Sequence, residues 1–466
     1  MIEFDLNEQM KEALDIICNT HDNLFITGVA GSGKTTFLKY LQNHCGKNMM
    51  VVAPTGIAAI NAGGATIHSA LGIPIGVYKP KISFNHTYSV LSNYKIRKDK
   101  ITNIKNLDLL VIDEVSMVRS DLMDAINDAL CTHRRASNEW FGGVQILMIG
   151  DLYQLSPVTK DEELALLGKT YKSQYFFDSI ALKAAGFRMV EFIKTYRQVD
   201  NVFLDILNEI RRGVLSPDNH ALLKKQHVPR FDVNQKGVVT ICTHNSKVDK
   251  INKQRLDELE GEPFTVEANI TGDFKENTYP TDCDLELKID AQVMILANDY
   301  KGRYCNGTIG TVEDYIEENG KVSKVLVRLD EHTVVELSPF TWDHYDYKTN
   351  DKGEIEKHSI GQFIQFPLKL AWAITVHKSQ GLTFDNVALD LSHSFCPGQV
   401  YVALSRCRTL ENTHLLSMFS QSQIYTDRKI NSFFRKKRAE ANVQSLGEEC
   451  AVEMAEKEED DNDTDF

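Results

Sequence analysis

The chain has 466 residues, of which 42% are hydrophobic and 25% are charged. This is the composition of an ordinary globular protein, and it excludes collagen-like and wholly disordered chains. No stretch approaches the roughly 18 apolar residues of a membrane span, and acids stand where a targeting peptide would have bases, so we expect a cytoplasmic protein without membrane association. The nine cysteines include no C-x-x-C pair, which predicts neither a disulfide framework nor a zinc site.

The formal charge of −13 is distributed unevenly along the chain. Residues 448–466 contain ten acids and one base, so they hold −9 and leave only −4 for the other 447 residues. Such a block of like charge with few apolar residues cannot form a core, and we predict that residues 441–466 are an acidic, disordered tail available to a protein partner. Residues 72–106 are the opposite extreme, with seven bases and one acid.

Short apolar runs alternate with helical patterns through the first half of the chain, as in a parallel sheet flanked by helices. Each run is too short for a free helix and rich in β-branched or large apolar residues. The runs lie at residues 23–27, 49–53, 109–113, 145–150 and 189–193. We predict one doubly wound α/β domain over residues 1–190, into which the basic residues 72–106 are inserted.

Residues 28–36, with the sequence GVAGSGKTT, lie between a predicted strand and a helical pattern. They fit G-x-x-x-x-G-K-[ST], in which backbone amides surround phosphates, the lysine reaches the outer phosphates and the following hydroxyl holds Mg²⁺. The alternative, a merely tight turn, is disfavoured by the strand–loop–helix context. The sequence therefore predicts a site for ATP and Mg²⁺, made by Gly28, Ala30, Gly31, Ser32, Gly33, Lys34, Thr35 and Thr36.

Asp113 and Glu114 come at the carboxyl end of a predicted buried strand, where ligands of open α/β sheets bind. We predict that Asp113 holds Mg²⁺ and that Glu114 aligns and deprotonates the attacking water. Gln154, after the next strand, could sense the γ-phosphate, although a polar loop is the simpler interpretation of this segment alone. Gln9, at the start of a helix, could pair with an adenine edge or could simply be a cap or surface residue.

The second half of the chain contains another α/β set, at residues 237–242, 366–381, 387–391 and 413–418. Between its two parts, residues 262–360 alternate apolar and polar residues between Gly and Asn turns, which predicts a small inserted antiparallel β-barrel. We therefore expect a second α/β lobe over residues 191–440. It has no further phosphate-binding loop, so one ATP per chain would lie between the lobes.

These segments resemble superfamily 1 helicases of the 5′-to-3′ branch, and specifically the Pif-one DNA helicase family, with RecD-like enzymes as relatives. The resemblance spans nearly all of residues 1–420 and includes LNEQ, GVAGSGKTT, VIDEVSMV, FGGVQILMIGDLYQLSPV, KTYRQ, LKLAWAITVHKSQGLTFD and VYVALSRC in order. It implies two RecA-like P-loop lobes and an ATP-dependent 5′-to-3′ DNA helicase with a role in genome maintenance. It also implies that Arg197 and Arg406 stabilise transition-state charge and that Gly381 lies beside the nucleotide.

The resemblance also assigns a track for DNA: Thr55, Thr66 and His68 in the first lobe, and Thr243, Asn245, His377, Lys378 and Ser379 in the second. Hydroxyls, amides and cations that bind phosphates suit a motor that must tolerate any base sequence. Opening and closing of the cleft would step these grips along a strand. Within residues 72–106, Tyr78, Phe84, Tyr88 and Tyr94 are interspersed with lysines, which fits either a pin at a duplex junction or a solvated basic loop.

Two alternatives to a helicase remain open from the sequence. One is a DNA-stimulated translocase that strips proteins with little unwinding. The other is a nucleotide-gated adaptor, with the acidic tail as a docking peptide, whose ATPase would be indifferent to single-stranded DNA. A nuclease is not indicated, because no carboxylate cluster remains unassigned. The expected partners are single-stranded DNA and DNA forks, and the expected state is a monomer.

Overall fold

The computed structural model describes residues 6–80, 96–134, 138–157, 159–196, 200–299, 301–350, 352, 354–392, 394 and 396–440, without the side chains of Asn277 and Lys357. The predicted Arg197, three aromatic residues of the basic insertion (Phe84, Tyr88 and Tyr94) and the acidic tail lie outside these ranges. The chain divides into two compact units, Met1–Tyr425 and Thr426–Phe466. In the second unit, residues 428–440 are helical. Among the described residues, no helix is both long and apolar enough to cross a membrane.

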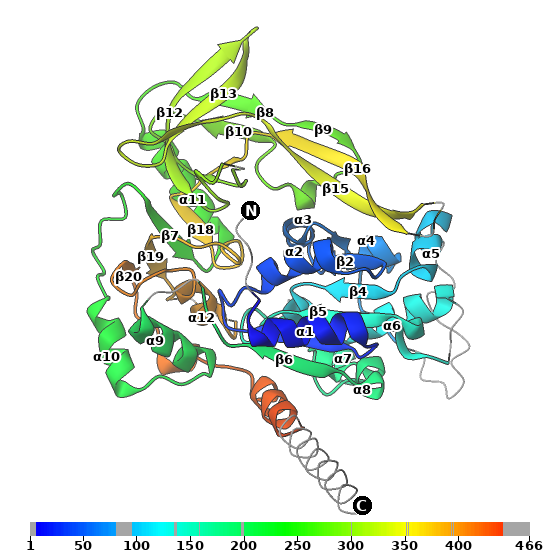
Figure 1. Cartoon of the computed structure of the whole chain (residues 1–466). Helices are drawn as coiled ribbons and strands as arrows, with labels where there is room; N and C mark the ends of the chain where they lie inside the picture. The colour runs from blue at the N-terminus through cyan, green and yellow to red at the C-terminus, as the bar shows by residue number, and fades with distance from the viewer. Residues whose placement is uncertain are drawn as a thin grey trace, which may run out of the picture. The chain divides into compact units, whose positions relative to one another are not determined.

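The amino-terminal part of the first unit is built on a six-stranded parallel sheet with the order β3-β2-β4-β5-β1-β6 (Figure 1). Every residue of β1, β4 and β5 is buried, as in parallel sheets covered on both faces. The strands are β1 (Leu24–Gly28), β2 (Met49–Ala53), β3 (Ala65–Thr66), β4 (Leu109–Ile112), β5 (Gln145–Ile149) and β6 (Arg188–Phe192). The predicted doubly wound parallel sheet is confirmed.

Eight helices of the described chain accompany this sheet: α1 (Glu8–Asn19), α2 (Lys34–His44), α3 (Gly56–Ala62), α4 (Ile67–Leu71), α5 (Lys98–Lys105), α6 (Ser120–Arg134), α7 (Asp161–Leu167) and α8 (Ile180–Ala185). The buried face of α1 and that of α2 share one apolar core with β1, β4 and β5. Because only residues 29–33 separate β1 from α2, this core fixes the position of the loop that joins them.

A second parallel sheet follows later in the chain, with the order β18-β7-β19-β20. Its strands are β7 (Val238–Cys242), β18 (Ala373–Thr375), β19 (Asn386–Asp390) and β20 (Thr413–Leu415). Its helices are α9 (Asn201–Arg211), α10 (Pro217–Lys225), α11 (Asn245–Glu258) and α12 (Gln399–Leu404). Two α/β lobes are thus present, and the two sheets lie side by side in Figure 1.

The segment between α11 and β18 does not pair its strands as the single small barrel that we predicted. β8 (Phe264–Glu267) pairs with β10 (Asp284–Leu287), and five strands pair in the order β14-β13-β12-β11-β17. These five are β11 (Gln292–Ile295), β12 (Ile309–Glu318), β13 (Lys321–Arg328), β14 (Val334–Leu337) and β17 (Leu368–Leu370). The long strands β15 (Phe340–Thr349) and β16 (Ile355–Gln365) pair instead with β9 (Asn269–Gly272) in a third antiparallel sheet.

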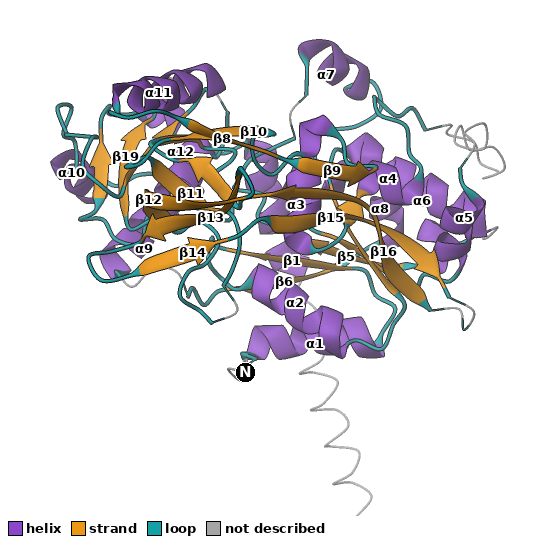
Figure 2. Ribbon diagram, turned by 90° about the horizontal axis from the view of Figure 1, so that it is seen from above, coloured by secondary structure: helices purple, strands orange, loops and turns teal. Residues whose placement is uncertain are grey.

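The third sheet packs on the first lobe, and Figure 2 shows β9, β15 and β16 crossing above α3 and α4. The Tyr347 hydroxyl of β15 accepts a hydrogen bond from Val51 N at 2.9 Å and donates one to Val51 O at 3.0 Å. Lys100 of α5 forms an ion pair with Asp346 at 3.3 Å. One lysine of the basic insertion is therefore held by protein rather than presented to a ligand.

Tyr78 is also unavailable for base stacking, contrary to the pin interpretation. It is buried, its backbone N–H donates to Asp121 at 2.8 Å and its hydroxyl donates to Asp128. Because both polar groups of Tyr78 are satisfied inside the protein, this residue anchors the start of the insertion to α6.

Candidate functional site

The phosphate-binding loop lies between β1 and α2, and its glycines are needed for its shape. Gly31 and Gly33 have φ of 80° and 86°, the left-handed region that favours glycine. A Cβ on Gly28 would lie 2.4 Å from the carbonyl oxygen of Phe192. No side chain caps the first turn of α2, so its backbone N–H groups and its dipole are directed at the loop. This is the geometry of an anion-binding helix terminus.

Lys34 is the first residue of α2 and folds over the loop. Its ammonium group donates to Gly28 O at 2.9 Å, to Val29 O at 3.0 Å and to Ser32 Oγ at 3.3 Å. The hydroxyl-bearing residues that follow, Thr35 and Thr36, are exposed. One cation therefore lies over the loop, and two exposed hydroxyl-bearing residues follow it.

Asp113 and Glu114 follow β4 and are close enough to Lys34 for its charge to oppose their protonation. Burial is the larger influence and raises the pKa of Asp113 to about 6 and that of Glu114 to about 7. The neighbouring Asp113 charge raises the Glu114 pKa further, since two close carboxylates resist joint ionisation. Glu114 has φ of 52°, a conformation that non-glycine residues seldom adopt.

No group of three or more His, Cys, Asp and Glu side chains that could hold a metal ion occurs among the residues that the structure describes. The exposed hydroxyl of Thr35 and the partly buried carboxylate of Asp113 are nevertheless hard oxygen donors, the type that Mg²⁺ prefers. Mg²⁺ is usually held by one or two protein oxygens together with substrate phosphates and water. The residues present therefore fit a magnesium ion that arrives with a nucleotide.

The second lobe reaches this site through Gln380, which the sequence did not single out. Its Nε2 donates to Glu114 Oε2 at 2.9 Å and to Gln154 Oε1 at 3.3 Å. Arg406 is 1% exposed, and its charge opposes the rise that burial causes in the pKa of Glu114. The guanidinium donates to Val402 O, Ser379 O, Leu382 O and Ser405 Oγ. Three predicted residues, Glu114, Gln154 and Arg406, thus come together at the junction of the lobes.

Three further polar side chains meet just behind the loop. The Tyr401 hydroxyl accepts a hydrogen bond from Ala30 N at 3.0 Å and donates one to Asp151 Oδ2 at 3.3 Å. Arg211 Nη2 donates to Asp151 Oδ1 at 3.2 Å. Asp151 and Tyr401 lie within motif segments, so the motifs could have pointed to these two residues. Arg211 belongs to no motif.

Gln9 lies on the first turn of α1, where Tyr196 also approaches. Asn7, the N-cap residue of α1, donates to the Tyr196 hydroxyl at 3.4 Å. The Tyr196 side chain is 50% exposed. Its ring would lie 3.5 Å from a Cβ placed on Gly33. An exposed aromatic side chain thus lies beside the phosphate-binding loop and next to the N-cap residue of α1.

Comparison with known proteins identifies the family. A model of PIF1-like helicases matches residues 5–221. The ATP-dependent DNA helicase Pif1 of Bdellovibrio bacteriovorus is 32% identical over 442 residues, which cover 93% of this chain and 92% of that protein. The chain belongs to the PIF1-like helicase family. The resemblance inferred from the motifs is therefore confirmed.

Solved structures of PIF1-like helicases match the fold as well. The Bacteroides Pif1 complex with ADP-AlF4 has a TM-score of 0.85 at 41% identity, covering 94% of this chain and 99% of that one. The Bacteroides Pif1 complex with ADP-AlF3 and single-stranded DNA has a TM-score of 0.67 at the same identity and coverage. The present structure therefore matches the complex with ADP-AlF4 more closely than the complex with ADP-AlF3 and single-stranded DNA.

The first-lobe residues that the family resemblance assigns to DNA lie near the amino ends of two short helices. Thr55 and Thr66 are N-cap residues, and their hydroxyls accept hydrogen bonds from Ala58 N and Ser69 N. The adjacent Gly56 faces Thr278, whose Cγ2 would lie 2.3 Å from a Cβ at Gly56. His68 Nδ1–H donates to Ile73 O at 3.1 Å, and burial lowers its pKa.

The second-lobe residues of the predicted DNA track differ in exposure. Lys378 and Asn245 are exposed, whereas His377 is half-buried and has a pKa that burial lowers. Thr243 and Ser379 are buried, and the Ser379 hydroxyl donates to Val376 O at 2.8 Å. Gly381 is exposed with φ of 83°. In the present structure, Lys378 and Asn245 are therefore the two of these side chains that are directly open to a phosphate.

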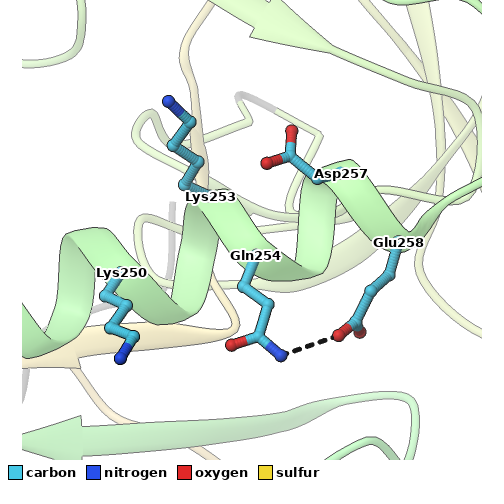
Figure 3. Close-up of a pocket in the computed structure, with 5 residues that line it drawn as sticks. All are labelled: Lys250, Lys253, Gln254, Asp257 and Glu258. Atoms are coloured by element: carbon cyan, nitrogen blue, oxygen red, sulfur yellow. Dashed lines mark hydrogen bonds between the residues drawn. The ribbon is translucent and has the colours of Figure 1, made fainter.

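A shallow pocket elsewhere on the second lobe is separate from this site. Its lining comes from one helix, α11, and consists of Lys250, Lys253, Gln254, Asp257 and Glu258 (Figure 3). The Gln254 amide donates to Glu258 at 2.8 Å. Two lysines precede two acids among the lining residues, and no predicted site residue lines the pocket. This surface is typical of a solvated helix face.

Proposed function

We propose that this protein binds one Mg²⁺–ATP between its two parallel sheets and uses hydrolysis to move 5′ to 3′ along single-stranded DNA. The protein is an ATP-dependent DNA helicase, as its membership of the PIF1-like family establishes. Beyond this activity, we propose the direction of movement and the roles of individual residues. The observation that best supports the residue roles is the hydrogen bond from Gln380 to Glu114, which connects the second lobe to the proposed catalytic base. The direction of movement rests on the resemblance of the motifs to the 5′-to-3′ helicases.

The proposed nucleotide site assigns each phosphate-facing group a role. Lys34 and the amides of residues 28–36 bind the phosphates, except the Ala30 amide, which donates to Tyr401. Thr35 and Asp113 would hold Mg²⁺, which would neutralise phosphate charge. Glu114 accepts a proton from the attacking water, for which a pKa of about 7 suits a general base at neutral pH. Gln154 and Gln380 orient that water or the γ-phosphate. Arg406 stabilises transition-state charge, and we propose the same for Arg197.

The adenine would lie at the amino end of α1. Gln9 offers an amide that can pair with the base edge, and the exposed ring of Tyr196 offers a face on which the base can stack. Gly381 would border the nucleotide from the second lobe. We assign the lobes to residues 1–190 and 191–440, with insertions at 72–106 and 262–360.

The proposed DNA track runs from Thr55, Thr66 and His68 to Thr243, Asn245, His377, Lys378 and Ser379. Thr278 packs against Gly56, next to Thr55, so the insertion covers part of the first-lobe end of this track. We infer that the insertion shifts when DNA binds. The Bacteroides Pif1 complex with single-stranded DNA differs more from the present structure overall, as its lower TM-score shows, and a shift of the insertion would contribute to such a difference.

Strand-separation assays on partial duplexes with a 5′ or a 3′ single-stranded tail test the proposal. We expect release of the 5′-tailed substrate with ATP and none with Lys34→Ala, and a monomer by light scattering. Release of the 3′-tailed substrate alone would refute the direction of movement. Release of neither substrate, with an ATPase that single-stranded DNA stimulates, would identify a translocase that unwinds poorly. An ATPase indifferent to DNA would refute the coupled motor.

A further inference from the structure

A buried tyrosine connects the phosphate-binding loop directly to the second lobe. All six residues of α12 are buried, and Tyr401 within it is 2% exposed. Its hydroxyl accepts a hydrogen bond from Ala30 N at 3.0 Å and donates one to Asp151 at 3.3 Å. Buried hydroxyls and amides require partners, and here each satisfies the other across 371 residues of chain.

Asp151 is held in place from its other side. It is 1% exposed, Arg211 donates to its Oδ1 at 3.2 Å, and Tyr153 N donates to the same oxygen at 3.1 Å. The Arg211 guanidinium lies 4.5 Å over the Tyr153 ring and 3.5 Å from Glu191. A buried carboxylate with a charged partner on one oxygen and a hydroxyl donor on the other has little freedom to move. Asp151 is therefore a well-held acceptor for the Tyr401 hydroxyl, bound within its own lobe by Tyr153 N and from the second lobe by Arg211.

The Ala30–Tyr401 hydrogen bond joins two lobes that we expect to move relative to one another. Ala30 follows β1 and Asp151 follows β5 in the first lobe, whereas α12 lies between β19 and β20 in the second. At the start of α12, a Cβ on Gly398 would lie 2.5 Å from the carbonyl oxygens of Tyr153 and Gln154. The helix is thus fixed to the first lobe at two points, and Arg406 follows it by two residues.

We propose that Tyr401 is a positioning residue that ties the phosphate-binding loop to α12 and so sets where Arg406 lies during hydrolysis. The inference rests on the proposed function, in which Arg406 stabilises transition-state charge. Lys34 donates to the carbonyls of Gly28 and Val29, which lie two residues and one residue before Ala30. Phosphates that draw Lys34 away from these carbonyls alter the loop, and the Ala30–Tyr401 hydrogen bond passes the change to α12. Binding and charge stabilisation are thereby coupled through one hydroxyl.

Tyr401→Phe tests the hydroxyl without removing the ring. We expect the DNA-stimulated kcat for ATP to fall about tenfold or more, as for a misplaced catalytic group, while KM for ATP changes less than about twofold. Tyr171→Phe is the matched control, because the buried Tyr171 hydroxyl also donates to a buried carboxylate, Asp124 at 2.8 Å, away from the loop. We expect Tyr171→Phe to lower the melting temperature comparably and to leave kcat unchanged.

Combining Tyr401→Phe with Arg406→Lys tests whether Tyr401 acts through Arg406. We expect the double variant to be about as slow as Arg406→Lys alone, because residues that act as a unit are not additive. Losses that multiply, or a Tyr401→Phe kcat equal to that of Tyr171→Phe, would overturn the inference. An Arg406→Lys variant with full turnover would instead refute the role that the proposed function gives to Arg406. The two failures are therefore distinguishable.

Discussion

Replacing Glu114 with glutamine should stabilise the nucleotide-free protein while stopping hydrolysis. Burial, helped by the Asp113 charge, raises the pKa of Glu114 from its ordinary 4.5 to about 7, although Lys34 and Arg406 oppose the rise. This rise in pKa means that, above pH 7, ionising Glu114 costs the folded state ~3 kcal/mol more than it costs the unfolded chain. Because the side chain is partly exposed, solvent screening reduces the expected value to ~1–2 kcal/mol. Glutamine removes this cost and can still accept the hydrogen bond from Gln380.

The sign of this effect depends on pH. Below the ordinary pKa of 4.5, both the folded and the unfolded wild-type chain hold the proton, so glutamine brings no gain. Between 4.5 and about 7 the unfolded chain ionises first, and wild-type stability falls relative to the variant until the folded pKa is passed. The gain in unfolding free energy should therefore grow by ~1 kcal/mol between about pH 5.5 and about pH 8.5.

Denaturant unfolding of both proteins in EDTA, without nucleotide, measures this gain. Glu162→Gln, at an exposed position of α7, is the control and should show no pH-dependent gain. In ATPase assays, Glu114→Gln should lose a factor of ~10²–10⁴ in kcat, as for removal of a general base. A stability gain that is absent, or equal at both pH values, would refute the reasoning about burial. Undiminished turnover would refute the assignment of the base.

The remaining predictions concern the loop and the DNA track. Lys34→Ala should lower ATP turnover by about a hundredfold or more, with affinity for single-stranded DNA retained in a fluorescence anisotropy assay; loss of both would indicate misfolding. Gly28→Ala should lower the free energy of unfolding in urea by ~1–3 kcal/mol, because the new Cβ would lie 2.4 Å from Phe192 O. Gly46→Ala, where a Cβ would have nothing within 4 Å, is the control and should not lower it. Equal losses of stability in the two variants would contradict the packing argument. Lys378→Ala should flatten the dependence of log Kd on log salt by about 0.7, the effect of one phosphate contact to a single strand. His377→Gln should leave that slope unchanged near pH 7, because burial lowers the pKa of His377 and keeps it neutral; a flatter slope there would show that the histidine is charged on DNA.

The elements that the sequence predicted well are those that depend on neighbours in the chain. The strand, loop and helix around Lys34 are determined by glycine conformations and by an apolar pattern within about 20 residues, and the parallel sheets followed from short apolar runs. The insertion was less predictable, because alternating patterns specify strands but not their partners. β15 and β16 pair with β9 rather than closing a barrel, and Tyr78 is buried against α6 rather than exposed.

The motifs that identify the family could thus be found from the sequence alone, since each motif contains its own chemistry within a few positions, and the roles of their individual residues stay predictions. Which side chain meets which across the junction of the lobes was decided by the tertiary structure. Gln380 reaches Glu114 over 266 residues and Tyr401 reaches Ala30 over 371. No periodicity encodes such pairs, because they form only when two separately folded sheets pack together and leave buried polar groups that must find each other.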